Sequence, residues 1–227
     1  MEYSGPLSSP WLLWQTIDSA FPIGGFAHSG GLEAAVQLGF VDDADSLADF
    51  VRTSLFQTAR LACPFVTEAW QRPADAETLS QQFDVLLVND AANRASRALG
   101  MAVLAAGETI APDSPVAAAR KIARQNRAFA HLPVAFGVLT KSIGLDETAA
   151  VDVYLFQTAR SLYSAAVRLG LVGPMAMQRL LADCAKDRDG LIALARRTTI
   201  DTAAQTAPTL DVLQSLHDRL YSRLFNS

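Results

Sequence analysis

Apolar residues recur every three or four positions along most of the chain, which is the spacing of one face of an α-helix. Residues 45–61 and 147–173 show the pattern most clearly; their apolar or small face positions are Leu47, Phe50, Val51, Leu55, Thr58, and Val151, Leu155, Leu162, Ala166, Leu169. No segment alternates strictly, and no hairpin dipeptide separates two strand-like runs. The pattern predicts an all-α fold of about nine or ten helices, in one helical-bundle-like domain spanning residues 1–227.

Start and stop signals divide this pattern into elements. Asp45, Ser114 and Asp146 can cap helix N-termini, while Gly39 and Gly144 suit C-terminal caps. The core FDVLLV could alone pass for a strand, but its Ala-rich flanks favour one long helix. The predicted helices cover 10–19, 30–38, 45 to a break or kink at Pro64, 76–107, 115 onward, 133–144, 147–173, two shorter segments and a C-terminal stretch.

The C-terminal stretch is predicted to be an amphipathic helix with Leu213, Leu216, Leu220 and Leu224 on one face. Such a face needs a partner, so residues 205–227 are interpreted as a partner-binding segment.

Two short sequence motifs each occur twice. LFQTAR stands at 55–60 and 155–160, and FAH stands at 26–28 and 129–131. Their common order suggests two related halves. Coincidence is the favoured interpretation, because helices rich in Ala, Leu and Arg share short words readily.

The net charge of −4 is unevenly distributed. Residues 1–50 hold seven acids and no Lys or Arg, whereas residues 120–227 hold fourteen bases and nine acids. This asymmetry favours a charged partner, although acids also gather at helix N-termini for electrostatic reasons. The sequence has no basic run with interleaved aromatic residues, so nucleic acid is disfavoured as a partner.

Other bulk features argue for a cytoplasmic protein. No apolar run approaches the length of a membrane span, and the first residues lack the basic start of a secretory leader. Cys63 and Cys184 are isolated in the sequence, so we expect them to be small core residues of a protein in a reducing compartment.

The segment 21–33, FPIGGFAHSGGLE, is the most unusual stretch. It matches no phosphate-binding loop. Ala27–Gly31 resembles a nucleophile elbow, with Ser29 as nucleophile and His131 or His217 as base, but an elbow requires a preceding strand. The preferred interpretation is a structured turn in which Ser29 caps the next helix.

The remaining polar candidates are weaker. His28, His131 and His217 lack the spacing of a zinc site, although His28 could supply one ligand between chains. Arg160, Ser164 and Arg168 lie four residues apart on one helix face, which is either solvated or a contact surface.

Several motifs resemble those of the UreF family of urease accessory proteins. They are D-S-x-F-P-x-G-G-F-A-H-S-x-G-L-E-A at 18–34, HLPVAFG at 131–137, SAAVRLG at 164–170 followed by Met177-Gln178, and the ending RLYSRLFNS. The resemblance runs nearly end to end.

The resemblance implies a non-enzymatic, all-α dimer that binds UreD (UreH in some organisms) and recruits the GTPase UreG. That assembly delivers nickel to apo-urease, so nickel is handled by the complex and this chain alone holds no stable cofactor. The implied partner-binding residues are Gly24, Gly25, Phe26, His28, Ser29 and Glu33 for the GTPase, Leu220 and Leu224 for UreD, and Arg160, Ser164, Arg168 and Gln178 as further contacts.

Two other functions compete with this one. An α-helical serine hydrolase using Ser29 is disfavoured by the missing sheet, and a direct nickel carrier is disfavoured by the scarcity of His and Cys.

Overall fold

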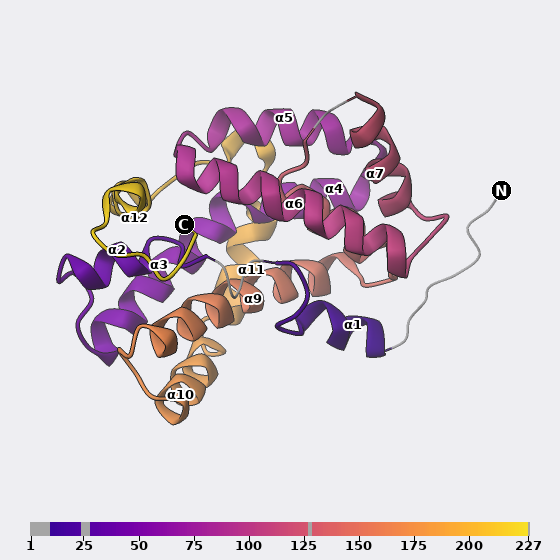
Figure 1. The fold of residues 1–227 in the computed structure, drawn as a ribbon. Helices are drawn as coiled ribbons and strands as arrows, with labels where there is room; N and C mark the ends of the chain where they lie inside the picture. Colours follow the sequence, from indigo (N-terminus) through magenta and orange to yellow (C-terminus); the bar gives the residue numbers. More distant parts are fainter. Residues whose placement is uncertain (1–9, 24–27, 127–128, 227) are drawn as a thin grey trace.

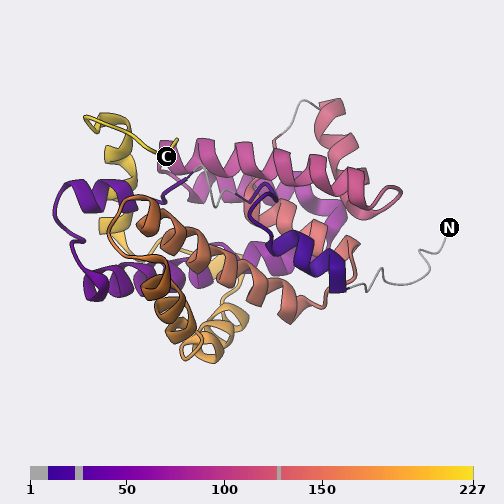
Figure 2. The same ribbon diagram turned by 60° about the horizontal axis from the view of Figure 1, so that its bottom comes forward.

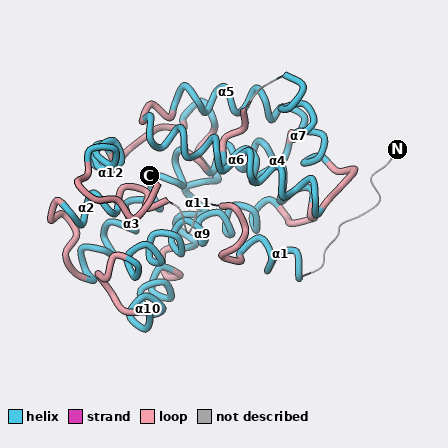
Figure 3. The backbone as a smooth tube through the Cα atoms, viewed as in Figure 1, coloured by secondary structure: helices cyan, strands magenta, loops and turns pink. Residues whose placement is uncertain are grey.

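The computed structural model describes residues 10–23, 28–126 and 129–226. Helices make up most of the described chain, and no strand occurs in it (Figures 1 and 3), which confirms the all-α prediction. The elements are α1 Pro10–Ile17, α2 Leu32–Gln37, α3 Ala44–Leu61, α4 Cys63–Gln71, η1 Pro73–Asp75, α5 Ala76–Leu86, α6 Asp90–Ile110, α7 Pro115–Asn126, α8 Leu132–Ser142, α9 Glu147–Arg168, α10 Pro174–Cys184, α11 Arg188–Arg197, η2 Ile200–Thr202, α12 Pro208–Leu216 and η3 His217–Arg219.

The described ranges hold twelve α-helices, more than the nine or ten expected. The long helix predicted over 76–107 is two helices, because Asn89 caps a new start by accepting a hydrogen bond from Ala92 N at 3.0 Å. Its side-chain amide also donates to Asp211 O at 2.6 Å and to Ser215 Oγ at 2.8 Å. The break is therefore held by α12, which is far away in sequence.

Two other boundaries differ from the prediction. Asp43, not Asp45, caps α3, because its carboxylate accepts from Ser46 N at 2.8 Å while the Ser46 hydroxyl accepts from Asp43 N. The C-terminal helix ends at Leu216, so Leu220 and Leu224 lie beyond it and the predicted leucine face was wrong. Asp146 caps α9 as predicted, and the chain breaks at Ala62, two residues before Pro64.

Helix α8 forms the centre of the fold. Nine of its eleven residues are buried, and it packs mainly against α4 and α6, with α7 and α9 also in contact (Figures 1 and 2). Gly137 faces the backbone of α4 so closely that an added Cβ would collide with Val66 O. The buried hydroxyl groups of Thr140 and Ser142 donate to carbonyls one turn earlier, so the helix carries polar groups without leaving them unpaired.

Helices α3 and α9 pack together, and each contains one copy of the LFQTAR motif. Equivalent positions have matching roles: Leu55 and Leu155 are buried, and Gln57 and Gln157 are buried and polar. Gln157 Nε2 donates to Thr16 O of α1 at 2.8 Å, and Gln57 Oε1 accepts from Ala207 N at 2.8 Å. Each copy thus fixes the backbone of one terminal segment.

No helix in the described ranges combines the length and the apolar content that crossing a membrane requires.

Gly137→Ala should lower the free energy of unfolding by about 1–3 kcal/mol, because the new methyl group must push α4 and α8 apart. Gly190→Ala is the matched control, since nothing lies within 4 Å of a Cβ at that helical position. The control should be neutral or should stabilise by about 0.5–1 kcal/mol through helix propensity. Urea unfolding of both variants measures the difference. Equal stabilities would show that the α4–α8 contact is not a tight constraint.

Candidate partner-binding site

Three segments meet on one side of the molecule: the described part of the glycine-rich turn (residues 18–23 and 28–31), the polar face of α9, and the C-terminal tail, defined here as residues 217–226. Figure 1 shows the C-terminus lying beside α2 and α12. Gln214 Nε2 donates to Gly30 O at 3.3 Å, and Gln37 Nε2 donates to Ser222 O at 2.9 Å. The turn is thus bonded to α12 and the tail to α2, and these bonds bring the two ends of the sequence to the same side of the molecule.

Glu33 holds the tail in place. Its carboxylate is 2 % exposed and accepts hydrogen bonds from Leu224 N at 2.6 Å and from Phe225 N at 3.3 Å. Hydrogen bonds to a charged acceptor are stronger than neutral ones, so this buried carboxylate gains its compensation from the tail backbone. In the chain by itself the tail covers the Glu33 side chain, and a direct contact between Glu33 and a partner stays a prediction.

Phe225 and Arg168 make the second tail contact. Phe225 is buried, and the Arg168 guanidinium carbon lies 4.3 Å from the centroid of its ring. This cation–π contact joins the tail to the C-terminal end of α9. Leu224 and Tyr221, by contrast, point outward: Leu224 is 51 % exposed and Tyr221 is fully exposed.

Two histidines, His28 and His217, interact near the tail. His217 is buried, and its Nδ1 lies 3.8 Å from Glu33 Oε2; neither ring nitrogen makes a hydrogen bond. The pKa of His28 is lowered, first by burial and then by the charge of His217. No group of three His, Cys, Asp or Glu side chains in the described ranges is arranged to hold a metal ion.

The turn encloses small cavities against α9. One cavity, of about 120 Å³, is lined by Asp18, Ser19, Phe21, Ile23, Gln157, Arg160, Ser161, Ser164 and Arg168. The predicted stripe of Arg160, Ser164 and Arg168 thus faces the beginning of the turn, and Asp18 adds a negative charge to the lining of the same cavity. A second cavity, of about 150 Å³, lies at His28 and Gly30 and also contacts Ser161.

Ser29 is not placed as a nucleophile. Its side chain is buried, and no strand precedes it in the described chain. Gly30 and Gly31 both have left-handed backbones, with φ of 60° and 89°, so α2 starts only after Gly31. The predicted capping role of Ser29 is corrected for the same reason, because Gly31 occupies the N-cap position.

His131 is likewise no base for Ser29. It is completely buried at the start of α8, with Nδ1 3.0 Å from Ser96 Oγ and Nε2 3.1 Å from Asp84 Oδ1. Because a carboxylate can only accept, Nε2 of His131 donates its hydrogen bond to Asp84, and Nδ1 then accepts from the Ser96 hydroxyl. The pKa of His131 is lowered by burial, against the opposing effect of Asp84. Sequence reasoning missed this network because its members lie on three different elements.

The other predicted residues lie apart or outside the described ranges. Gly24, Gly25 and Phe26 fall outside them. Gln178 lies on α10 and lines a separate apolar cavity of about 420 Å³ between α3, α9, α10 and α11. Leu220 is partly buried against the core.

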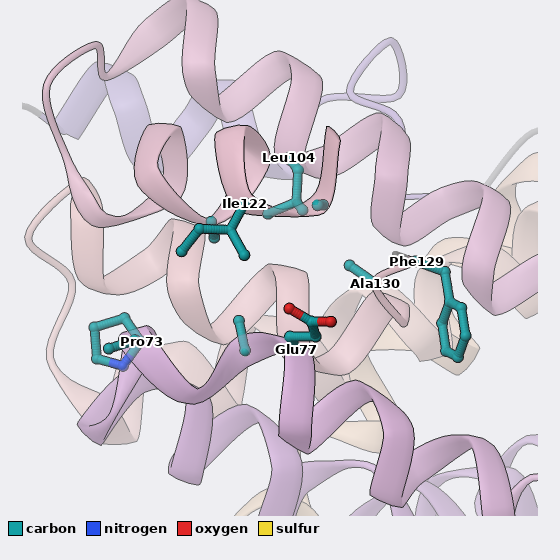
Figure 4. Close-up of a pocket in the computed structure, with 10 residues that line it drawn as sticks. Pro73, Glu77, Leu104, Ile122, Phe129 and Ala130 are labelled. Atoms are coloured by element: carbon teal, nitrogen blue, oxygen red, sulfur yellow. The ribbon is translucent and has the colours of Figure 1, made fainter. Parts of the chain in front are cut away.

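A further pocket lies between η1, α5 and α7, and Leu104 of α6 also lines it (Figure 4). Figure 4 shows Pro73, Ile122 and Leu104 around it and the Glu77 carboxylate at its edge. Glu77 accepts a hydrogen bond from Asn126 Nδ2 at 2.7 Å. The pocket has room for about one water, so it is not a ligand site.

Comparison with known proteins decides the family. Residues 41–185 match the UreF family model. Urease accessory protein F of Oryza sativa subsp. indica is 36% identical over 223 residues, which cover 96% of this chain and 85% of the relative. The protein of the same name from Arabidopsis thaliana is 36% identical (96% and 92% covered), and urease accessory protein UreF of Paenarthrobacter aurescens is 32% identical (95% and 96% covered).

The chain belongs to the UreF family. Membership supports a role in urease maturation, and the family is one of accessory proteins. The matched region runs from the start of α3 to the end of α10, so the turn and the tail lie outside it. The alignments with the three relatives cover nearly the whole chain.

Glu33→Gln should loosen the tail of this UreF-family chain, because a neutral amide is a weaker acceptor for two backbone N–H groups. We expect amide hydrogen exchange at Leu224 and Phe225 to accelerate at least about tenfold, with a loss of about 1–3 kcal/mol in stability. Gln37→Ala on the same helix is the matched control, since its bond to the tail is exposed. Unchanged exchange at both amides in Glu33→Gln would contradict the assigned role of Glu33.

Acid should destabilise the protein through His131. Its folded pKa lies below the unfolded value of about 6.5, so the unfolded chain binds more protons between the two pKa values. The contribution to stability is complete above about pH 6.5 and is lost as pH falls through the folded pKa. Urea unfolding at a series of pH values from 8 to 5 should show a shallower decline for His131→Asn than for the wild type, although the variant is weaker throughout. Parallel curves would contradict this assignment.

Proposed function

We propose that this chain is a non-enzymatic scaffold that binds UreD (UreH) and recruits the GTPase UreG, so that the complex inserts nickel into apo-urease in the cytoplasm. The proposal includes a homodimer as the working state. It rests on UreF-family membership and on the joining of the glycine-rich turn, the polar face of α9 and the tail into one surface.

The anchored tail is the proposed contact for UreD. Glu33 and Arg168 fix the backbone and ring of its last residues, and this leaves Tyr221 and Leu224 exposed. A pre-ordered segment loses less conformational entropy on binding than a free one. Exposed aromatic and aliphatic side chains on such a segment suit an interface anchor.

The turn side of the junction is the proposed contact for the GTPase. His28 lines one cavity there, and Arg160 lines the other, beneath the beginning of the turn. Asp42, just before α3, and Asp45 and Asp49 in its first turns are exposed, and these carboxylates suit a partner with a basic surface. The position of Asp43 has a structural reason instead: it caps α3, and its hydrogen bonds from Ser46 lower the pKa of its carboxyl group.

Neither competing function gains support from the site. A hydrolase using Ser29 requires an accessible hydroxyl beside a base, and Ser29 is buried. A nickel carrier requires a set of donors, and the described side chains offer no such cluster.

Co-purification with tagged UreD and UreG, with and without GTP, tests the proposal. Tyr221→Ala combined with Leu224→Ala should weaken UreD capture by roughly thirtyfold or more, as loss of an interface anchor does. His28→Ala should weaken UreG capture and leave UreD capture intact. Gln178→Ala is the control for both, because it lies at a separate cavity.

Point variants are preferred to removal of residues 209–227, because that deletion also removes Leu210, Leu213 and Phe225 from the core. Variants that melt like the wild type and still bind both partners at wild-type affinity would overturn the proposal. Loss of both partners from Gln178→Ala alone would place the interface elsewhere.

A further inference from the structure

Four helices line a cavity at the edge of the molecule where α10 lies (Figure 1). Its volume is about 420 Å³, and each helix supplies one leucine to it: Leu55 of α3, Leu155 of α9, Leu181 of α10 and Leu191 of α11. Cavities of about 300–1,000 Å³ with a mostly apolar lining are typical of small-molecule sites. This cavity shares no lining residue with the two cavities that lie against α9 at the glycine-rich turn, so it is a separate site.

Small side chains keep the cavity open. Ala159 of α9 lines it, as do Ala182 of α10 and Ala185 just after that helix. Met177 is the one buried residue of α10, so this helix fills little of the space beside it. An unfilled apolar space costs stability because its lining atoms lack contacts. A molecule that entered the cavity would supply those contacts.

The leucine lining is deep, which favours a small molecule as the occupant. Leu55, Leu155 and Leu191 are at most 5 % exposed, whereas Phe156, which also lines the cavity, is 40 % exposed. An occupant reaches the leucines only by entering the cavity, and the flat surface of another protein cannot do so. The Phe156 ring can then cover one side of the bound molecule.

The charged groups in the lining satisfy each other. Arg188 Nε donates to Asp152 Oδ1 at 2.9 Å and to Oδ2 at 2.8 Å, and Arg188 Nη2 donates to Oδ2 at 2.6 Å. The remaining guanidinium nitrogen, Nη1, donates to Asp189 Oδ1 at 2.9 Å. A charged ligand would lose its hydration without meeting an unpaired charge of opposite sign, which is costly. The lining therefore favours a neutral ligand.

Gln178 supplies a polar group that a neutral ligand can use. Its Nε2 lies 3.6 Å from Met177 Sδ, and a thioether is only a weak acceptor. The side-chain amide therefore keeps the capacity to donate to a carbonyl or to accept from a hydroxyl. The Cys184 thiol, which also lines the cavity, is already 3.4 Å from the Tyr163 hydroxyl.

We propose that the cavity between α3, α9, α10 and α11 binds one neutral, mostly apolar small molecule. The apolar part of the ligand fills the space between Leu55, Leu155 and Leu181, and its single carbonyl or hydroxyl group bonds the side-chain amide of Gln178. This inference goes beyond the proposed function and does not depend on it.

Fluorescence titration of the full chain with prodan tests the inference. Prodan is a neutral naphthyl ketone whose emission shifts to the blue in apolar surroundings. It should bind at one saturable site with a dissociation constant below about 100 μM. Naphthalene-2-sulfonate, which has a similar ring system and a negative charge, should not displace it at about tenfold excess.

Variants place the probe in this cavity. Ala182→Phe should weaken prodan binding at least about tenfold, because the new ring occupies the space. Ala193→Phe is the matched control, since Ala193 is exposed on α11 and does not line the cavity. Ala182→Leu is a smaller filling variant, to be used if circular dichroism or thermal melting shows that Ala182→Phe is misfolded.

Gln178→Leu tests the polar contact separately. It should weaken prodan binding about fivefold or more, because the ketone loses its hydrogen-bond donor. Displacement of prodan by 2-ethylnaphthalene, which has no polar group, measures the affinity of that hydrocarbon. Its affinity should be the same for the wild type and for Gln178→Leu.

Three results would overturn the inference: no saturable prodan binding up to about 100 μM, wild-type affinity in a folded Ala182 variant, or equal loss of affinity in Ala193→Phe. Displacement by naphthalene-2-sulfonate would contradict the neutral ligand. If a folded Ala182→Phe loses UreD or UreG, the cavity serves a protein partner and the small-molecule site is wrong. Capture of both partners by Ala182→Phe together with lost prodan binding would support the inference, whatever the His28 and tail variants show.

Discussion

The close contact between α8 and the backbone of α4 is the constraint on which the rest of the structure depends. Gly137 allows the two helices to approach until a methyl group would collide with Val66 O, and Gly100 allows α6 the same approach to the Ala130 carbonyl. With α8 enclosed on most sides, α3 and α9 pack outside it. Both terminal segments then have no room in the centre and lie on this outer layer.

Polar side chains therefore help to place the terminal segments, in addition to the apolar residues that these segments bury. Gln157 holds α1, Gln57 and Asn89 hold the segment around α12, and Glu33 holds the last residues. Such bonds are directional and individually modest, so they fix a position without making it permanent. A scaffold that exchanges partners can use this property, because its binding segments are ordered in advance yet attached at few points.

Helix ends that depend on neighbouring residues can be predicted from the sequence. Asp146 caps α9 and Gly39 ends α2 with a left-handed backbone because these effects act within one turn of helix. Features that depend on residues far away in the sequence could not be predicted. The break at Asn89 needs α12, and the burial of Glu33 needs Leu224, 191 residues later.

The central claim is that the glycine-rich turn, the polar face of α9 and the tail act as one partner-binding unit. Hydrogen exchange of the chain, alone and in complex with UreD and UreG, measures this most directly. The account predicts that protection rises together at residues 28–34, 160–168 and 217–226 when the complex assembles. Protection confined to α5, α6 and α7, with these three segments unchanged, would contradict it.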